Sequence, residues 1–566
     1  MSVTIRNASL KILRKQSKIV IPCIRRKTTG TEQNILKSSY EDVPKLNVTV
    51  NDFLWMNLDR WPDKTASVCA VTGRGYTYAQ THKMTNTFAA SLRTKLNLKN
   101  DDKVAIILPN VPEYPTVILG VLQAGCVASM MNPIYTTDEL KRQIALIDCK
   151  AVVTSKISYT NVKGALEALK LKIPVILIDH DSLPEGTVKF SELVQDFSID
   201  LDCLKSVKRS PDDLAILPFS SGTTGFPKAV SLTHRSVVAV NQMIAQPQIV
   251  AVPETTASFQ SVFPCVLPFF HIFGFNALML NQMYLGCKLV TMPYFKPELF
   301  LKTVVEHKAT ALFIVPPMVV FLGKHPVVTP EHLKSVVSIV SGAAPVSKHD
   351  AEAVLKKNPN LNFRQGYGLT ETNGGICIAH NKDVNHASVG HPFSKCEIKI
   401  ADLETKEALA PGNDGEIWMR GPCLMEGYYK NKEATDEVMT SDGWYKTGDI
   451  GKYDDNGYIY VTDRLKELIK VKGFQVPPAE LESVIRTHPQ VLDCAVIGLP
   501  DPITGETPKA LIVVQKDQII KEKEILEYVN SKVSGYKKIT QLQVVEEIPK
   551  NPAGKILRRV LKEKYC

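Results

Sequence analysis

The segment PFSSGTTGFPKAV, residues 218–230, concentrates hydroxyl side chains, two glycines and one lysine. A backbone of this composition can fold closely around an oxyanion. It is not a P-loop, because Pro227 stands in place of the second glycine and Ala229 stands in place of the hydroxyl residue after Lys228. Proline offers no N–H to a phosphate, and alanine cannot reach a magnesium ion. The segment therefore favours a phosphate loop of another kind, with a Gly/Ser-rich linker as the alternative.

The residues on either side of this segment favour the loop over the linker. The apolar run LAILPF, residues 214–219, precedes it, and we expect a helix to follow it. A flexible linker rarely lies directly between two such buried elements.

Strands and helices that alternate along the chain must position this loop. Strands are expected at 103–109, 151–155 and 174–179, and helices at 113–126 and 136–148. In the helix at 136–148, Leu140, Ile144 and Ile147 share one face, and acidic residues occupy the first turn. The alternation predicts an α/β fold with helices covering mainly parallel strands.

The stretch that comes nearest to a membrane span is Ser261–Leu280. It contains two prolines, a histidine, a glycine and an asparagine, whose polar groups would be left unsatisfied in lipid. We therefore expect a buried strand, a loop and a helix here, and no transmembrane segment. The 12 cysteines are scattered without zinc-site spacing, and this predicts reduced, mostly buried thiols.

With 566 residues the chain is too long for one core. Its character changes near Asp463, so we expect a large domain over 45–462 and a small domain over 463–566. In the small domain we expect a helix at 477–488, with Leu481, Val484 and Ile485 facing inward, followed by strands at 494–498 and 510–515.

The net charge of +10 is concentrated at the N-terminus. Residues 1–31 contain eight Lys and Arg and no acid; without them, 60 basic residues face 58 acidic ones. A nearly neutral body argues against nucleic-acid binding. The basic, hydroxyl-containing segment 1–31 is typical of a mitochondrial transit peptide, with a disordered basic tail as the alternative. The expected location is the mitochondrial matrix; the alternatives are the cytoplasm, or the peroxisome without a C-terminal Ser-Lys-Leu signal.

Five further stretches accompany the opening loop. They are LPFFHIFG at 267–274, SGAAPV at 341–346, RQGYGLTET at 364–372, the run from GWYKTGD to PPAELE at 443–482, and PKNPAGKILRR at 549–559. Together, and in this order, they resemble the adenylate-forming superfamily of 4-coumarate–CoA ligases, acyl-CoA synthetases and beetle luciferases. The resemblance runs from about residue 45 to the end of the chain.

The resemblance implies a large N-terminal domain of layered α/β sheets and a small mobile C-terminal α+β domain. It also implies ATP, Mg²⁺ and coenzyme A. A carboxylate would attack the α-phosphate of ATP to form an acyl-adenylate and pyrophosphate. The thiol of coenzyme A would then displace AMP.

The same resemblance implies roles for individual residues. Thr223, Thr224 and Lys228 would hold the β- and γ-phosphates, Thr370 the α-phosphate, and Asp449 and Arg464 the ribose. Glu371 would bind magnesium, with Thr224 as a second ligand. His271 would gate the acyl pocket. The wider nucleotide-binding set is Ser220, Ser221, Gly222, Gly225, Gly342, Ala343, Ala344, Gln365, Gly366, Tyr367, Gly368, Leu369 and Val461.

Two groups in the small domain are assigned to different half-reactions. Lys555 would meet the carboxylate and the α-phosphate during adenylation. Lys470, Lys472, Gly473 and Gln475 would serve thioester formation after the small domain turns about Asp463. Ala229 departs from the family's usual glycine, a change that is tolerable unless this position needs a positive φ.

Several functions share these motifs. The leading prediction is an acyl-CoA ligase for a medium-chain fatty acid or a related acid, because the small residues at 373–375 would leave a deep acyl channel. A 4-coumarate-type aromatic acid ligase and a luciferase-like oxygenase are the alternatives. A carrier-loading module and a non-catalytic binding protein are disfavoured, the first by the lack of a carrier segment and the second by the presence of Glu371, Asp449, Arg464 and Lys555. No oligomeric state is predicted.

Overall fold

The computed structural model describes residues 34–179, 183–220, 227–383, 385–472, 474–514, 521–551 and 554–566. Residues 34–566 form one compact unit. The expected transit peptide lies outside the described residues, and its assignment stays a prediction.

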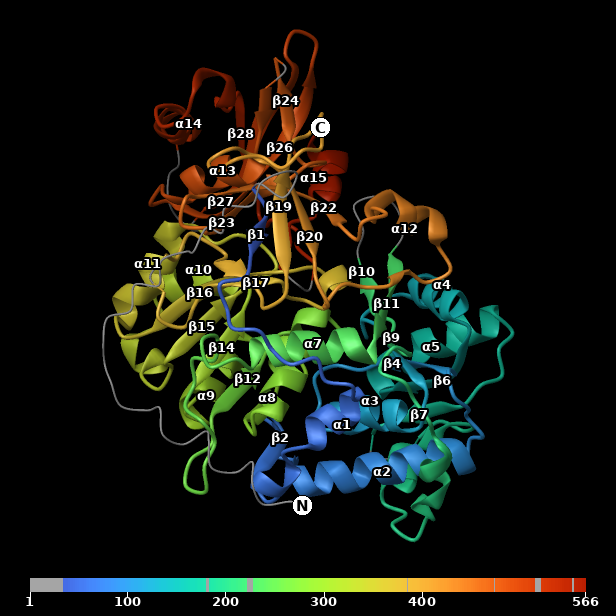
Figure 1. The fold of residues 1–566 in the computed structure, drawn as a ribbon. Coiled ribbons are helices and arrows are strands. Elements are labelled where there is room, and N and C mark those ends of the chain that lie inside the picture. The colour runs from blue at the N-terminus through green and yellow to red at the C-terminus, as the bar shows by residue number, and fades with distance from the viewer. Residues whose placement is uncertain are drawn as a thin grey trace. The chain divides into compact units, whose positions relative to one another are not determined.

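A nine-stranded sheet contains the strands expected in the first part of the chain (Figure 1). Its core is parallel, in the order β9-β5-β4-β6-β7-β8, and β10, β11 and β21 extend it with antiparallel pairings. The strands are β4 (Lys103–Ile107), β5 (Val127–Met130), β6 (Cys149–Thr154), β7 (Val175–Leu177), β8 (Val188–Lys189), β9 (Leu214–Ile216), β10 (Phe219–Ser220), β11 (Lys228–Thr233) and β21 (Gly427–Tyr428).

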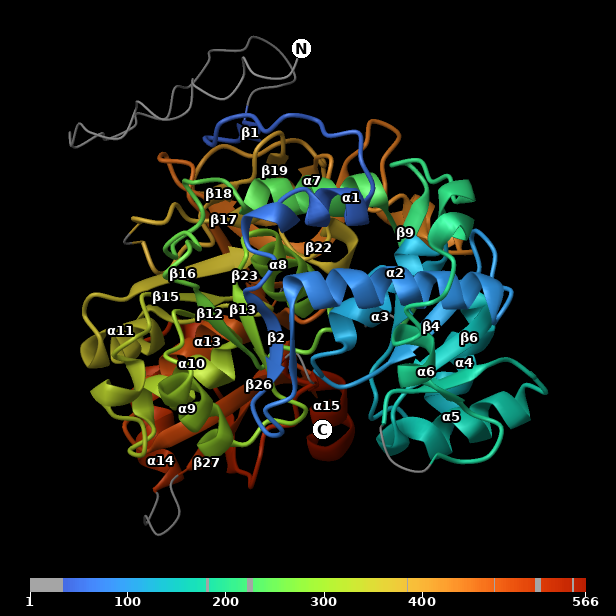
Figure 2. The ribbon, with the colours of Figure 1, turned by 90° about the horizontal axis from the view of Figure 1, so that it is seen from below.

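Helices pack in pairs beside this sheet. Figure 2 shows α2 (Tyr78–Thr94) next to α3 (Tyr114–Gln123), and α4 (Thr137–Ile147) next to α5 (Lys156–Ala168). The start of α4 is set by a capping box, in which Thr136 accepts from the N–H of Glu139 and the Glu139 carboxylate accepts in return. Leu140, Ile144 and Ile147 are fully buried, as the spacing predicted.

The segment 218–230 ends in a strand that the sequence did not predict, and the expected helix follows that strand. β11 pairs antiparallel with β10, so that Ala229 lies opposite Phe219, and helix α7 (His234–Ile244) begins only afterwards. Two antiparallel strands therefore flank the loop. Ala229 is buried and is not among the residues with positive φ, so glycine is not needed at this position.

Two smaller sheets contain the next parallel strands. β12 (Val262–Cys265), β13 (Lys288–Thr291) and β2 (Thr65–Cys69) run parallel, with β3 (Gly75–Thr77) antiparallel at the edge. β14 (Ala311–Ile314), β15 (Ser338–Ser341) and β16 (Asn362–Tyr367) run parallel and continue antiparallel into β17 (Cys377–Ile378) and β18 (His391–Pro392). The apolar stretch at 261–280 forms β12, a loop and a helix at Phe273–Leu280, as predicted.

Other helices lie near these two sheets (Figure 1). They are α1 (Val50–Trp55), α8 (Asn281–Tyr284), α9 (Pro297–Glu306), α10 (Pro316–Lys324) and α11 (Lys348–Lys357). The helices α6 (Phe190–Val194) and α12 (Lys432–Val438) are short.

An antiparallel sheet follows, in the order β1-β19-β20-β22-β23. Its strands are β1 (Leu36–Lys37), β19 (Glu397–Ala401), β20 (Gly415–Arg420), β22 (Tyr445–Tyr453) and β23 (Ile459–Arg464). β23 ends at Arg464, directly after the predicted hinge Asp463.

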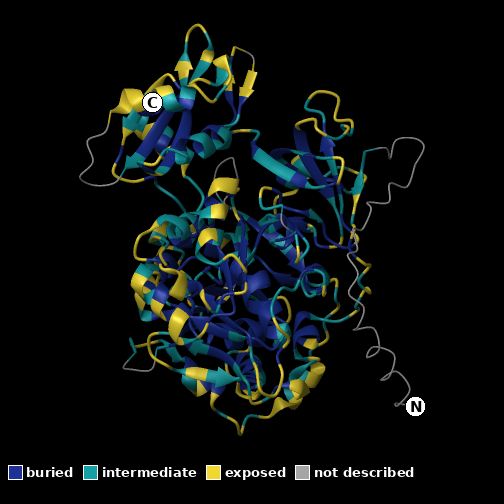
Figure 3. Cartoon of the chain, turned by 90° about the vertical axis from the view of Figure 1, so that its left-hand side faces the viewer, coloured by how far each residue is buried: buried dark blue, intermediate teal, exposed yellow. Residues whose placement is uncertain are grey.

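The residues after Arg464 build a small α+β domain with its own apolar clusters (Figure 3, dark blue strands). Leu481 and Ile485 of helix α13 (Pro478–Arg486) are fully buried, whereas Val484 is only half-buried against the same cluster. The elements are β24 (Ile469–Val471), β25 (Phe474–Val476), α13 (Pro478–Arg486), β26 (Val491–Asp501), β27 (Gly505–Val514), α14 (Glu522–Asn530), β28 (Gln541–Val544) and α15 (Arg558–Tyr565).

Two further expectations concern membranes and thiols. None of the helices in the described ranges has the length and apolar character needed to cross a bilayer. The cysteines of the described residues are free thiols, and most of them are buried.

Candidate active site

A cavity of about 390 Å³ brings together most of the predicted site residues that the structure describes. Its predicted lining residues are Ser220, Lys228, His271, Gly342, Ala343, Gly366, Tyr367, Gly368, Leu369, Thr370, Glu371, Arg464 and Lys555. They come from segments more than three hundred positions apart in the sequence, so the fold and not local spacing gathers them.

The carboxyl ends of two parallel strands supply the glycine-rich part of the lining. β15 and β16 pair so that Ser341 lies opposite Gln365, which places Gly342 and Gly366 side by side. A Cβ on Gly368 would lie 2.5 Å from the backbone of Gly375, so a side chain at this position would collide with main-chain atoms. The turn therefore needs glycine at 368 to bring its backbone so close to the facing chain.

Glu371 and Lys228 face the cavity on either side of Tyr428. The phenol of Tyr428 donates to Oε1 of the buried Glu371 at 2.9 Å, and the Lys228 ammonium lies 4.8 Å from the centre of its ring. Burial, followed by the Glu371 charge, raises the pKa of Tyr428 well above its usual range, so the phenol stays a donor. A carboxylate and a cation thus line the same cavity.

Asp449 lies behind the lining and does not itself line the cavity. Its carboxylate is paired with the Arg464 guanidinium at 3.0 Å and accepts from the phenol of Tyr367 at 2.7 Å. Only 4% of Asp449 is exposed, so a ribose hydroxyl reaches it only where these partners leave room. Within β22 and β23 the register places Asp449 directly opposite Arg464.

Lys555 enters the cavity from the loop before α15. The side chain of Asn551 accepts from the backbone N–H of Lys555 at 2.9 Å, and Gly554 has a φ of +78° that favours glycine. Burial, followed by the nearby Arg464 charge, lowers the pKa of the Lys555 ammonium to about 8, while Glu467 opposes this shift. The site therefore holds a cation that is unusually easy to deprotonate.

His271 lies at the start of the helix Phe273–Leu280, and burial lowers its pKa to about 4. The ring is therefore neutral near pH 7, and its Nδ1 accepts from the N–H of Phe273 at 3.3 Å. Asn110 holds the preceding loop, because its amide donates to the carbonyls of Cys265 and Leu267 at 2.8 Å each. Sequence reasoning missed Asn110; its place directly after the predicted strand at 103–109 was the available signal.

Other predicted residues lie outside the lining. Gln365 does not reach the cavity, because its amide accepts from Val346 N–H at 2.7 Å and donates to the Val346 carbonyl at 3.0 Å. It supports the loop at 342–346 instead. Ala344 and Val461 do not line the cavity either.

The residues predicted for the second half-reaction lie on the β24–β25 hairpin. Lys470 and Gln475 are exposed cross-strand partners, and Lys472, with a φ of +50°, belongs to the turn between them. None of the three lines the cavity. Five residues of the phosphate loop, Ser221, Gly222, Thr223, Thr224 and Gly225, lie outside the described residues, as does Gly473.

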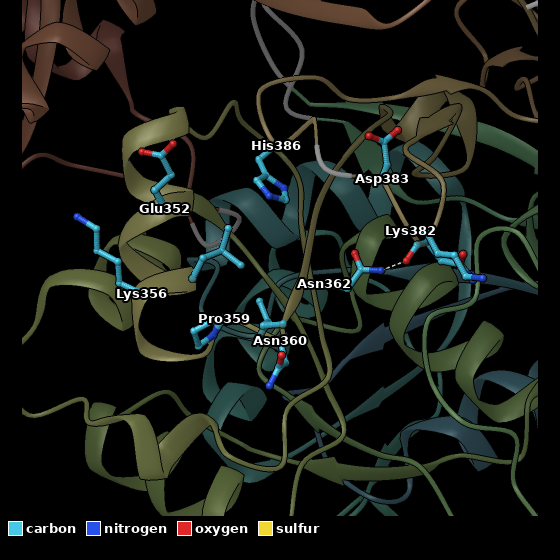
Figure 4. A pocket seen from close by; sticks show the side chains of 11 residues that line it. Glu352, Lys356, Pro359, Asn360, Asn362, Lys382, Asp383 and His386 are labelled. Atoms are coloured by element: carbon cyan, nitrogen blue, oxygen red, sulfur yellow. Dashed lines mark hydrogen bonds between the residues drawn. The ribbon is translucent and has the colours of Figure 1, made fainter. Parts of the chain in front are cut away.

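A second hollow, of about 600 Å³, lies between the end of α11 and the segment around Lys382 (Figure 4). Asn362 donates to the carbonyl of Asn381 at its wall. Glu352, Lys356, Asp383 and His386 give it a mixed charge, and it contains none of the predicted site residues. The smaller cavity is therefore the candidate active site.

Comparison with known families shows the class of protein to which the chain belongs. The model of the AMP-binding enzyme family matches residues 54–429, and that of the AMP-binding enzyme C-terminal domain matches residues 480–555. The chain belongs to this adenylate-forming family. The matched ranges include the lining from Ser220 to Glu371 and, in the small domain, Lys555.

Relatives and solved structures extend the match over nearly the whole chain. 4-Coumarate–CoA ligase 1 of Solanum tuberosum is 36% identical, covering 95% of this chain and 98% of its own, and the Arabidopsis thaliana enzyme of the same name is also 36% identical. ATP-bound MatB from Rhodopseudomonas palustris is 25% identical, with a TM-score of 0.79 over 92% of this chain and 99% of its own. The anthranilate CoA ligase AuaEII in complex with anthranoyl-AMP has a TM-score of 0.84 at 22% identity, over 92% and 98% of the two chains, which establishes the shared fold.

Proposed function

We propose that this adenylate-forming enzyme is an AMP-forming acid–CoA ligase whose substrate is an apolar carboxylic acid. The observation that carries the proposal is the lining of a single cavity. It combines Lys228, Glu371, Arg464 and Lys555 with apolar side chains from other elements. A charged nucleotide and an uncharged acyl chain can therefore share one site.

In the first half-reaction a carboxylate oxygen attacks the α-phosphorus of ATP, and the bond to pyrophosphate breaks. Negative charge grows between the carboxylate and the phosphate, where preorganised cations lower the barrier. Lys555 supplies such a cation, and Lys228 is placed to hold the leaving phosphates. Arg464 is oriented for the ribose by its pairing with Asp449.

The donor set fits a magnesium–nucleotide complex. In the described part of the chain no three His, Cys, Asp or Glu side chains are grouped to hold an ion alone. Mg²⁺ commonly uses one or two protein carboxylates together with substrate phosphates, and Glu371 provides one such carboxylate. When bound, the ion would neutralise phosphate charge. Thr224, the second predicted ligand, lies outside the described residues.

The apolar lining supports an aliphatic acyl chain. It comes from α7, the helix Phe273–Leu280, β14 and the region of β17 and β18, and includes Ile244, Ala277, Phe313, Ile378 and Phe393. No charged side chain of α7, β14 or that helix lines the cavity, so a phenolic hydroxyl would find few partners on these elements. We therefore propose a medium-chain fatty acid or a related apolar acid.

An aromatic acid is the second candidate, because relatives at 36% identity are named 4-coumarate–CoA ligases. Coenzyme A is the proposed acceptor in the second half-reaction. Its thiol sulfur attacks the acyl carbonyl and AMP leaves, after the small domain turns about Asp463 and brings in the β24–β25 hairpin.

A panel of acids tests the proposal. Purified enzyme is incubated with ATP, Mg²⁺ and coenzyme A, and AMP release is measured for saturated acids from acetate to palmitate and for 4-coumarate. We expect the highest kcat/KM at a medium chain length and a strict dependence on coenzyme A. A clear preference for 4-coumarate would replace the aliphatic assignment, and oxygen-dependent turnover without coenzyme A would indicate an oxygenase.

We also propose that residues 1–31 direct the enzyme to mitochondria. The support is their composition of eight Lys and Arg without an acid.

A further inference from the structure

Glu467 lies in the turn after β23 and faces two cations of the C-terminal segment. Its Oε2 is 2.5 Å from the guanidinium of Arg558, and its Oε1 is 4.0 Å from the ammonium of Lys555. All three side chains are at most one-quarter exposed. Glu467 is thus the acid of the small domain that faces the adenylation lysine directly.

The position of Glu467 is fixed by its neighbours. Its backbone N–H donates to the carbonyl of Arg464 at 2.9 Å, which closes the turn after the hinge. Arg558 also binds Glu482 of α13 at 2.6 Å, so the guanidinium is held between two carboxylates. Because Glu467 and Lys555 both follow Asp463, their contact belongs to the small domain and moves with it.

We infer that Glu467 is a positioning residue that keeps Lys555 protonated, and therefore active in adenylation, at the pH at which the enzyme works. This inference rests on the proposed function only for its consequence for adenylation. The pairing itself is a property of the small domain.

The charges around Lys555 explain why it needs this acid. Arg464 and Arg558 repel the ammonium, and burial removes water from it; Asp449 and Glu467 attract it. Both oxygens of Asp449 are engaged, Oδ1 by Arg464 at 3.0 Å and Oδ2 by the phenol of Tyr367 at 2.7 Å. Glu467 uses Oε2 for Arg558, and its Oε1 faces Lys555. The Oε1 of Glu467 is 4.0 Å from the Lys555 ammonium, and both side chains are mostly shielded from water. An opposite charge within about 4–6 Å typically shifts a pKa by one unit or more.

Removal of the Glu467 charge should lower the pKa of Lys555, because Glu467 raises it in the wild type. The pKa of Lys555 is about 8, so a reaction that needs the ammonium is lost as the pH rises through 8. Glu467→Gln removes this attraction. We therefore expect the pH at which adenylation is half lost on the alkaline side to fall by about one unit. At pH 9 adenylation should be about tenfold lower than in the wild type, whereas at pH 6 the two enzymes should agree within about twofold.

Two measurements on the full chain test the inference. ATP–pyrophosphate exchange with the best acid of the panel is recorded from pH 6 to 9.5 for the wild type, Glu467→Gln and Glu467→Asp. The control is Glu480→Gln, which removes another glutamate of the same domain, one that pairs with Lys537 at 2.7 Å. We expect the pH at which exchange is half lost to fall in Glu467→Gln, to fall less in Glu467→Asp and to be unchanged in the control.

The second measurement needs no substrate. The rate at which acetic anhydride labels Lys555 is followed by peptide mass spectrometry as a function of pH, since only the neutral amine reacts. The midpoint should lie near pH 8 in the wild type and about one unit lower in Glu467→Gln. A shifted midpoint without exchange activity for any acid would refute the proposed function alone. An unshifted midpoint in folded Glu467→Gln would overturn the inference, whatever the exchange profile.

Discussion

Replacing Lys555 with alanine should separate the two half-reactions. Its ammonium has a pKa of about 8, so roughly three quarters of the molecules carry the charge at pH 7.5. The side chain lines the cavity and is 25% exposed, so little water would replace the missing charge. One preorganised contact of this kind is worth about 3–4 kcal/mol, so adenylation should fall by roughly 10²–10³.

The assay measures each half-reaction separately. ATP–pyrophosphate exchange reports adenylation, and coenzyme A with a synthetic acyl-adenylate reports thioester formation. Lys555→Ala should lose the first and keep most of the second. Lys470→Ala, altered on the exposed β24–β25 hairpin, should keep more of the exchange than of the thioester step.

The control is Lys523→Ala, on an exposed lysine of α14 whose side chain is 87% accessible, and it should leave both steps unchanged. Equal losses in the two half-reactions of Lys555→Ala would refute the division of labour between the two lysines.

Three further predictions concern the loop, the strand after it and the N-terminus. Gly368→Ala should reduce exchange more than tenfold or prevent folding, because its Cβ would lie 2.5 Å from the Gly375 backbone. The control Gly535→Ala should be tolerated, because no atom lies within 4 Å of the added Cβ. Normal exchange in Gly368→Ala would contradict this packing. Ala229→Gly should lower the free energy of unfolding by at least about 0.5–1 kcal/mol in urea titrations, because glycine has more backbone entropy in the unfolded state and because a buried methyl group is lost. A stabilised variant would contradict the observed backbone. A fusion of residues 1–45 to a fluorescent reporter should stain mitochondria, and a diffuse signal would refute the targeting proposal.

The alternation of elements in the first half of the chain could be predicted because each element carries its own periodic signal. The helix at 136–148 is an example: its apolar spacing and its capping residues agree, and both are local properties. The element after the phosphate loop could not be predicted in this way. Its strand is selected by pairing with β10 and with β21, a partner about two hundred positions away, and local patterning does not encode that pairing.

The candidate site, too, could be predicted only in part from the sequence. The residue types that suit a nucleotide and a carboxylate, such as Lys228, Glu371, Arg464 and Lys555, were readable from motifs. Gln365 was assigned to the nucleotide from its motif, yet its amide is used to hold Val346. A motif specifies which residues are near one another in the chain, but it does not specify which atoms of a side chain remain available after packing.

The sequence alone thus determined the chemistry that is possible here, because side-chain type and local spacing decide which groups can bind phosphate, metal or carboxylate. Tertiary structure decided the protonation and the hydrogen-bond partners of those groups. The charge of Lys555 depends on burial and on Arg464, Arg558 and Glu467, and Asp449 is held by Arg464 and by Tyr367. These effects act through space between segments distant in the chain, and electrostatic energies change steeply with distance and with access of water. They can therefore be determined only once the chain is folded.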